Sequence, residues 1–246
     1  MKLLMIHGWT FTLGMILLVF SGCSIPEDDI PGSIEQHKVA YPDTLDLFAL
    51  GDSYTIGQGV TAEESWPYQL SRELTSNGLI VENLQIIAQT GWTTSNLLSA
   101  LGKADLTQLQ DKTLVFLMIG VNNQYQNLPF EQFQHEFNQL VNHSLQIAET
   151  HRKVFVMSIP DYGVTPFGQN TVHSPEVISL AIDEYNTYMR NVCIDLDISF
   201  IDVTRLSRML GDSPEALSTD GLHPSGTQYE MWVELILPQV LEVLII

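Results

Sequence analysis

Short apolar runs alternate along this chain with longer stretches in which apolar residues recur at helical spacing. The apolar runs predict strands over residues 45–50, 79–88, 113–119, 153–159 and 199–203, of which 113–119 (TLVFLMI) has the strongest strand pattern. Helical spacing predicts helices over residues 66–74, 93–101, 130–150, 175–192 and 228–244. Asn77-Gly78 is a signal for the end of the first of these helices, and Ser174 is a candidate N-cap of the fourth.

The order of these elements predicts an α/β fold. Strands that are nearly continuous apolar runs are buried on both faces, which implies a parallel sheet covered by helices. We therefore predict a three-layer α/β/α sandwich with about five parallel strands. Ligands in such folds bind beyond the carboxyl ends of the strands, so the loops after Leu50, Ala88, Ile119 and Ile159 are expected to line the site.

The first 23 residues follow a different pattern, typical of a targeting signal. Lys2 precedes an apolar segment at residues 11–20, and Ser21-Gly22-Cys23 follows it. Small residues before a cysteine resemble the lipobox of bacterial lipoproteins, although Phe20 stands where Leu is usual. A transmembrane anchor is the alternative, but the apolar segment is shorter than the roughly 20 residues that a span needs.

We therefore expect a lipoprotein signal peptide over residues 1–22 and a lipidated Cys23. Residues 23–43 then form a tether rich in proline and acidic residues, and the folded domain occupies residues 44–246. Acyl chains on Cys23 would hold the protein at a membrane without a spanning helix. Ser24 after the cysteine resembles the signal for outer-membrane sorting, so the expected location is the bacterial cell envelope, on the periplasmic side.

Composition narrows the classes of partner. The chain of 246 residues has 29 acidic and 10 basic residues, a formal net charge of −19. Nucleic acids and anionic lipid headgroups are recognised by Lys and Arg, so this charge argues against both as partners. Cys193 is left without a partner if Cys23 carries lipid, and its apolar neighbours indicate a core residue, with a catalytic thiol as the alternative.

Three loops at predicted strand ends carry residues suited to acyl transfer. Residues 51–53 (GDS) place a serine at a strand-to-helix turn, where it is either a nucleophile or part of a helix cap. Residues 120–123 (GVNN) offer amide side chains that can stabilise an oxyanion, or form a polar turn. Residues 220–223 (DGLH) place an aspartate where it could orient a histidine, although a lone histidine is usually a surface residue.

These motifs together resemble the SGNH (GDSL-type) hydrolases. Gly51-Asp52-Ser53 is similar to the first sequence block of that family, and Gly91 to the glycine of the second. Residues 120–122 match the third block and residues 220–223 the fifth, in family order. The chain departs from the family pattern at Asn123, where many members have Asp, and at Tyr54, where the motif has Leu.

The resemblance implies a role for each matching residue. Ser53 would be the nucleophile, His223 the general base and Asp220 the residue that orients His223. The backbone N–H groups of Ser53 and Gly91 and the side-chain amide of Asn122 would form the oxyanion hole. The family needs neither a metal nor a cofactor for this chemistry.

The sequence thus predicts a serine esterase that hydrolyses carboxylic esters with a small or medium acyl group. Its substrate would be a small-molecule, glycan or lipid ester of the envelope, and the residues do not choose among these. Two alternatives remain at this stage. One is an envelope lipoprotein that binds acylated glycans without catalysis, and the other is an acyltransferase that uses the same triad.

Several other residues have less specific patterns. Asp161 and Tyr162 follow a predicted strand and would form either pocket wall or a packing or turn contact. Trp92 and Tyr125 would either line the acyl or alcohol pocket or pack in the core or at the rim. Histidines at spacings of eight on one predicted helix do not form a metal-binding pair and are expected on a solvated face: His135, His143 and His151.

Overall fold

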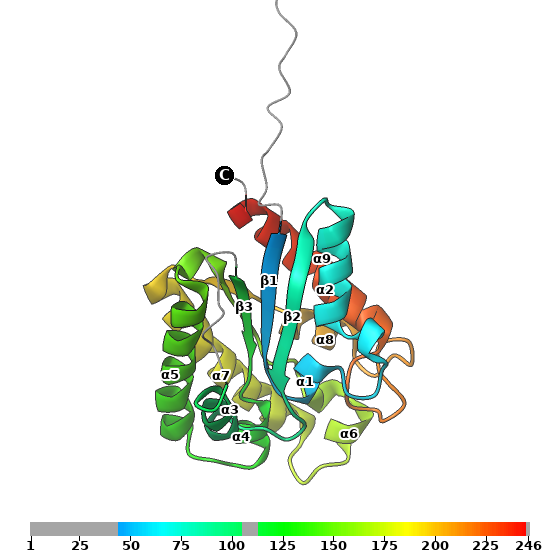
Figure 1. Ribbon diagram of the computed structural model, residues 1–246. Helices are drawn as coiled ribbons and strands as arrows, with labels where there is room; N and C mark the ends of the chain where they lie inside the picture. The colour runs from blue at the N-terminus through cyan, green and yellow to red at the C-terminus, as the bar shows by residue number, and fades with distance from the viewer. Residues whose placement is uncertain (1–43, 105–112, 245–246) are drawn as a thin grey trace, which may run out of the picture. The chain divides into compact units, whose positions relative to one another are not determined.

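A five-stranded parallel sheet organises the domain (Figure 1). The computed structural model describes residues 44–104 and 113–244, so the predicted signal peptide, lipidated Cys23 and tether lie outside the described residues. Within them the strands are β1 (Thr44–Gly51), β2 (Ile80–Ala88), β3 (Thr113–Met118), β4 (Val154–Met157) and β5 (Ser199–Ile201). All neighbouring pairs in the order β2-β1-β3-β4-β5 are parallel, which confirms the predicted fold.

The five predicted helices are present, with ends that differ by a few residues. They are α2 (Trp66–Ser76), α3 (Thr94–Leu101), α5 (Phe130–Ala148), α7 (Pro175–Leu196) and α9 (Gly226–Leu244). Asn77 ends α2 and the Ser174 hydroxyl caps α7, as predicted. Shorter helices lack a readable period and were not predicted: α1 (Ser53–Ile56), α4 (Val121–Tyr125), α6 (Pro166–Gln169), α8 (Thr204–Leu210), η2 (Ala62–Glu64), η3 (His151–Lys153) and η4 (Tyr162–Val164).

Helices cover both faces of the sheet. Helices α2 and α9 pack together on one face, and α3, α5 and α7 lie on the other (Figure 1). Strands β3 and β4 are buried along their whole length, as is β1 after its first residue. None of the described helices is both long and apolar enough to cross a membrane.

The prediction that the strands are buried on both faces is wrong for the two edge strands, β2 and β5. Every residue of β2 is exposed or half-buried, because β2 pairs with β1 alone, and β5 is half-buried at Ser199 and Phe200, because it pairs with β4 alone. Glu82 and Asn83 interrupt the apolar run of β2, as expected for an edge strand that avoids pairing with other chains.

The strand order places the candidate site. The chain runs from β1 outward to β2 and then returns to the other side of β1 to form β3. A crevice for ligands opens at such a switch point, beyond the carboxyl ends of the two strands that border it. Ser53 follows β1 and Asn122 follows β3, so both lie at this crevice.

Candidate functional site

Three of the predicted site residues form one chain of hydrogen bonds. Ser53 Oγ lies 2.9 Å from His223 Nε2, and His223 Nδ1 lies 2.6 Å from Asp220 Oδ2. Ser53 and His223 are buried, whereas Asp220 is on the exposed side of the site. The structure therefore brings together a hydroxyl, an imidazole and a carboxylate from loops 170 residues apart in the sequence.

The turn after β1 holds Ser53 in place. Asp52, and not Ser53, caps the single-turn helix α1, because its carboxylate accepts a hydrogen bond from the Tyr54 N–H (3.0 Å). The serine hydroxyl is thereby left for His223. Gly51 is required by close packing, since a Cβ there would lie 2.2 Å from Thr55 Oγ1 and 2.4 Å from the Met118 carbonyl oxygen.

Asp220 is bound by its own loop on one oxygen and by the histidine ring on the other. Its Oδ1 accepts hydrogen bonds from the N–H groups of Leu222 and His223 (both 2.9 Å) and from the Ser218 hydroxyl (2.8 Å). Partial burial acts to raise the pKa of Asp220, but these bonds and the one from the His223 ring outweigh it and lower the pKa to about 2. Asp220 is therefore ionised at neutral pH and holds His223 with a full negative charge.

The aromatic residue beside the serine packs against the histidine. The Tyr54 ring lies 5.1 Å from the His223 ring, centroid to centroid, and the Tyr229 hydroxyl donates a hydrogen bond to the Tyr54 carbonyl (3.0 Å). Helix α9, which carries Tyr229, thus fixes the residue that supports the imidazole. The departure from Leu at position 54 does not disturb the triad geometry.

The loop after β2 carries Gly91 to the same place. The Trp92 N–H donates to the Gln89 carbonyl (3.2 Å), which closes a turn, and Gly91 has a φ of +79° that favours glycine. The Asn122 amide donates one hydrogen bond to the Trp92 carbonyl (3.0 Å) and has a second N–H available. Ser53, Gly91, Asn122 and His223 all line one cavity of about 170 Å³.

Asn123 has a positioning role that sequence reasoning did not assign. Its buried side chain accepts from the Thr94 N–H (3.0 Å) and donates to Thr94 Oγ1 (2.7 Å), so it fixes the start of α3. The Thr94 hydroxyl in turn donates to the Glu136 carboxylate. An aspartate at position 123 would leave two carboxylates competing for one hydroxyl proton, which explains the amide where many family members have an acid.

The other residues singled out from the sequence divide between pocket and packing. Tyr125 and Tyr162 line the cavity, and burial raises the pKa of Tyr162 to about 12. Asp161 has a packing role, because its buried carboxylate accepts from the Gly163 N–H (2.8 Å) and the Arg208 guanidinium (2.7 Å). The Trp92 side chain packs against the hydrophobic core.

The remaining cysteine and the three histidines lie away from the triad. Cys193 is 1% exposed in the core, and burial raises the pKa of its thiol to about 12, which fits core packing and a poor nucleophile. His135 and His151 are exposed, as expected, whereas His143 is half-buried. Within the described ranges these histidines do not belong to any group of three or more metal-ligating side chains.

Asp52 is a buried carboxyl next to the candidate nucleophile, and its environment is invisible in the sequence. It is 1% exposed, and burial raises its pKa from 3.8 to about 7 despite the hydrogen bond from the Tyr54 N–H. The folded state therefore favours the protonated form of Asp52 more than the unfolded state does. Its stabilising contribution is complete below pH 3.8 and is lost as the pH rises through about 7.

We predict that Asp52→Asn removes this pH dependence from the free energy of unfolding. The pKa difference corresponds to on the order of 4 kcal/mol, so the variant should gain stability relative to wild type between pH 4 and about pH 8. Urea unfolding followed by circular dichroism across this range measures the difference. The exposed Asp212→Asn variant is the control, and a parallel pH profile for Asp52→Asn and wild type would contradict the prediction.

The sequence of the chain matches a known protein family over most of its length. Residues 49–231 match the model of the GDSL-like Lipase/Acylhydrolase family. The chain therefore belongs to this family of SGNH (GDSL-type) hydrolases and is a hydrolase that acts on ester bonds. Comparison with curated protein sequences gives no match.

Solved structures show the same fold at low sequence identity. TesA aligns with a TM-score of 0.64 and 17% identity over 81% of this chain and 99% of TesA. The lipase Lip_vut3 from a goat rumen metagenome aligns with a TM-score of 0.64 and 21% identity over 79% of this chain and 97% of the lipase. The family 3 carbohydrate esterase of Clostridium thermocellum aligns with a TM-score of 0.60 and 21% identity over 82% of this chain and 97% of the esterase. Such identities show a shared fold.

Proposed function

We propose that the protein is a serine esterase in which Ser53 is the nucleophile, His223 the general base and Asp220 the residue that orients the base. The observation that carries this proposal is the hydrogen-bonded chain from Ser53 Oγ through His223 to Asp220, with distances of 2.9 and 2.6 Å. A neutral serine is a weak nucleophile, and an adjacent base oriented by a third group is what activates it.

Hydrolysis would proceed in two halves. Ser53 Oγ attacks the ester carbonyl carbon while its proton passes to His223 Nε2. The bond to the alcohol oxygen then breaks, the alcohol leaves with the proton from His223, and an acyl group remains on Ser53. Water attacks this acyl-enzyme with His223 again as the base, which releases the acid and restores Ser53.

The oxyanion of each tetrahedral intermediate would be bound by three donors from residues that line the 170 Å³ cavity. These are the N–H groups of Ser53 and Gly91 and the free N–H of the Asn122 amide. Support for Asn122 comes from its fixed orientation, because its other N–H is held by the Trp92 carbonyl. Donors that are fixed before the reaction stabilise the developing charge without reorganisation.

We predict that Asn122→Ala lowers kcat by about a hundred- to a thousandfold while the fold is retained. The variant loses an oxyanion donor but leaves Ser53, His223 and Asp220 in place. Steady-state hydrolysis of p-nitrophenyl acetate, with circular dichroism to check folding, measures the effect. Asn77→Ala, at the end of α2, is the matched control, and a wild-type rate in Asn122→Ala would remove Asn122 from the site.

A fluorophosphonate probe tests the assignment of the nucleophile directly. We expect stoichiometric labelling of the protein, with mass spectrometry placing the adduct on Ser53 and no labelling of His223→Ala on the same timescale. Absence of labelling in well-folded protein would instead support the non-catalytic binder of acylated glycans. Hydrolysis measured against transfer to an added alcohol separates an esterase from an acyltransferase.

The location and domain organisation are part of the same proposal. A signal peptide over residues 1–22, a lipidated Cys23, a tether to residue 43 and a hydrolase domain over residues 44–246 would place the esterase at the bacterial envelope. Growth with an alkyne-bearing fatty acid should label the wild type and the Cys193→Ser control but not Cys23→Ser. Equal labelling of all three proteins, or of none, would contradict lipidation at Cys23.

A further inference from the structure

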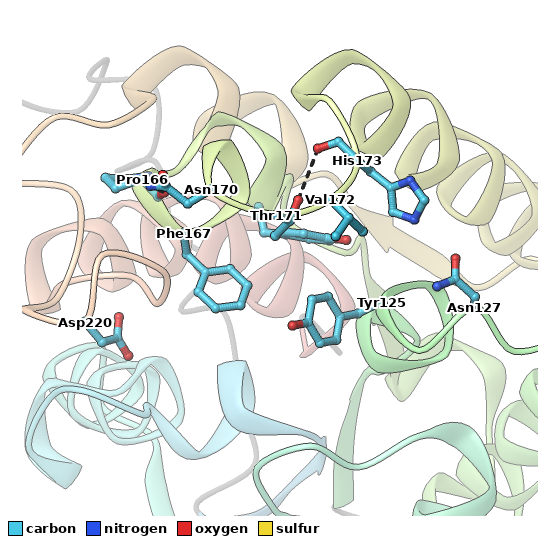
Figure 2. Close-up of a pocket in the computed structure, with 10 residues that line it drawn as sticks. Tyr125, Asn127, Pro166, Phe167, Asn170, Thr171, Val172, His173 and Asp220 are labelled. Atoms are coloured by element: carbon cyan, nitrogen blue, oxygen red, sulfur yellow. Dashed lines mark hydrogen bonds between the residues drawn. The ribbon is translucent and has the colours of Figure 1, made fainter.

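A second, larger pocket opens beside the triad. It measures about 700 Å³ and shares a wall of three aromatic rings, Tyr125, Tyr162 and Phe167, with the cavity that Ser53 lines. Figure 2 shows the rings of Tyr125 and Phe167 in the middle of this pocket, with Asp220 at one end and Asn127 and His173 at the other. A molecule bound along the pocket therefore reaches the triad at its Asp220 end.

The cavity at Ser53 and the larger pocket differ enough in volume for each to hold a different part of an ester. Sites for drug-sized ligands measure about 300–1,000 Å³. The cavity at Ser53, Gly91 and Asn122 is smaller than this range at about 170 Å³, whereas the neighbouring pocket falls inside it. The small cavity suits a short acyl group, and the large pocket suits a bulky alcohol.

The lining of the large pocket indicates an uncharged, hydroxyl-rich ligand. Aromatic rings offer flat apolar surface, and Asn127, Asn170 and Thr171 add neutral hydrogen-bonding groups. Among the described residues that line it there is no Lys or Arg, and the ionised Asp220 stands at one end. A phosphate would find no Lys or Arg among these lining residues, with His173 the one basic side chain, and would meet the Asp220 carboxylate in a chain of net charge −19.

The aromatic wall is fixed to the catalytic loop. The Phe167 N–H donates to the Gly221 carbonyl (3.1 Å), which joins α6 to the loop of Asp220 and His223. The Tyr162 hydroxyl donates to the Gln124 side chain (2.8 Å), which joins the wall to the loop after β3. Tyr125 and Phe167 nevertheless remain 48% and 37% exposed, and exposed apolar surface beside a site is typical of ligand binding.

We infer that the large pocket binds the alcohol part of the ester, and that this alcohol is bulky, uncharged and rich in hydroxyl groups, as a sugar unit is. This inference rests on the proposed esterase function. It assigns Tyr125, Phe167 and Asn127 to substrate specificity, and it assigns a short acyl group to the cavity at Ser53.

The test compares acetate esters that differ only in the alcohol: ethyl acetate, an acetylated disaccharide and the same disaccharide carrying a phosphate. We expect kcat/KM to be at least about tenfold higher for the neutral disaccharide than for either of the other two. Phe167→Ala should lower the ratio of kcat/KM for the disaccharide to that for ethyl acetate by about tenfold, mainly through KM. The control is Tyr68→Ala, which removes an aromatic ring on α2 that is 40% exposed against 37% for Phe167, and it should leave this ratio unchanged.

A gain of function tests the charge argument. Val172 lines the pocket and is 95% exposed, so Val172→Lys adds a cation without disturbing packing. This variant should raise kcat/KM for the phosphorylated disaccharide relative to the neutral one by about threefold or more at low salt.

The outcomes separate this inference from the proposed function. If no ester is hydrolysed and the fluorophosphonate probe does not react, the proposed function itself fails. If ethyl acetate is hydrolysed but Phe167→Ala and Val172→Lys leave the ratios unchanged, only the pocket assignment fails. A preference for long acyl chains on ethanol, lost in Phe167→Ala, would show that the pocket holds the acyl group instead and would overturn the inference.

Discussion

Ser53→Ala is expected to lower kcat for ester hydrolysis by about a millionfold, an effect matched only by loss of the general base. Without Oγ no acyl-enzyme forms, and His223 has no hydroxyl to deprotonate. The fold should be unaffected, because the Ser53 hydroxyl bonds to His223 while Asp52 caps the helix. Hydrolysis of p-nitrophenyl acetate by freshly purified variant, with the melting temperature measured in parallel, checks both statements.

Ser76→Ala provides the matched control, since Ser76 is an exposed serine on α2 whose hydroxyl bonds only within the helix. It should retain the wild-type rate. A loss of less than about a hundredfold in Ser53→Ala would show that another group attacks the ester, because activated water alone does not replace a nucleophile in such a triad.

The fold could be predicted from the sequence because its strands and long helices have clear periods. Residues 114–118 are all apolar and all buried, so the pattern and the environment agree. The edge strand β2 is exposed or half-buried along its length because it pairs with β1 alone, and the polar Glu82 and Asn83 in its apolar run are the signal that distinguishes it from a central strand. Helices of four or five residues, such as α1 and α4, are shorter than the window in which a helical period is visible.

The residues of the candidate site that lie in short sequence motifs could be predicted from the sequence. Ser53, Gly91 and Asn122 each lie in a short motif that follows a strand, and the structure brings them together with Asp220 and His223. The expectation that residues 220–223 also lie at a strand end is wrong, because their loop joins helices α8 and α9. What could not be predicted depends on contacts between distant segments. Burial raises the pKa of Asp52, and the contact with Thr94 gives Asn123 its positioning role. Phe167 is brought beside Asp220 and His223 by the hydrogen bond from its N–H to the Gly221 carbonyl.

Asp220→Asn is expected to lower kcat by about ten-thousandfold with little change in structure. The Asn side chain keeps an oxygen that can accept from the Leu222 and His223 N–H groups, so the loop should hold its shape. Its amide nitrogen replaces the oxygen that lies 2.6 Å from His223 Nδ1 and can only donate there. The ring must then accept at Nδ1 and carry its proton on Nε2, where it faces Ser53 and cannot act as a base.

The altered tautomer should also lower the reactivity of Ser53 toward the fluorophosphonate probe. Because the defect is the position of a proton, fluorophosphonate labelling of Ser53 should fall together with kcat, while binding of a substrate measured through KM changes little. Asp197→Asn, an aspartate with a 95% exposed side chain that pairs with His151, is the matched control and should keep the wild-type rate. If Asp220→Asn retained more than about a tenth of the wild-type kcat, the carboxylate would not be orienting His223. NMR of the imidazole nitrogens then decides the point, since the wild type should carry the proton on Nδ1 and the variant on Nε2.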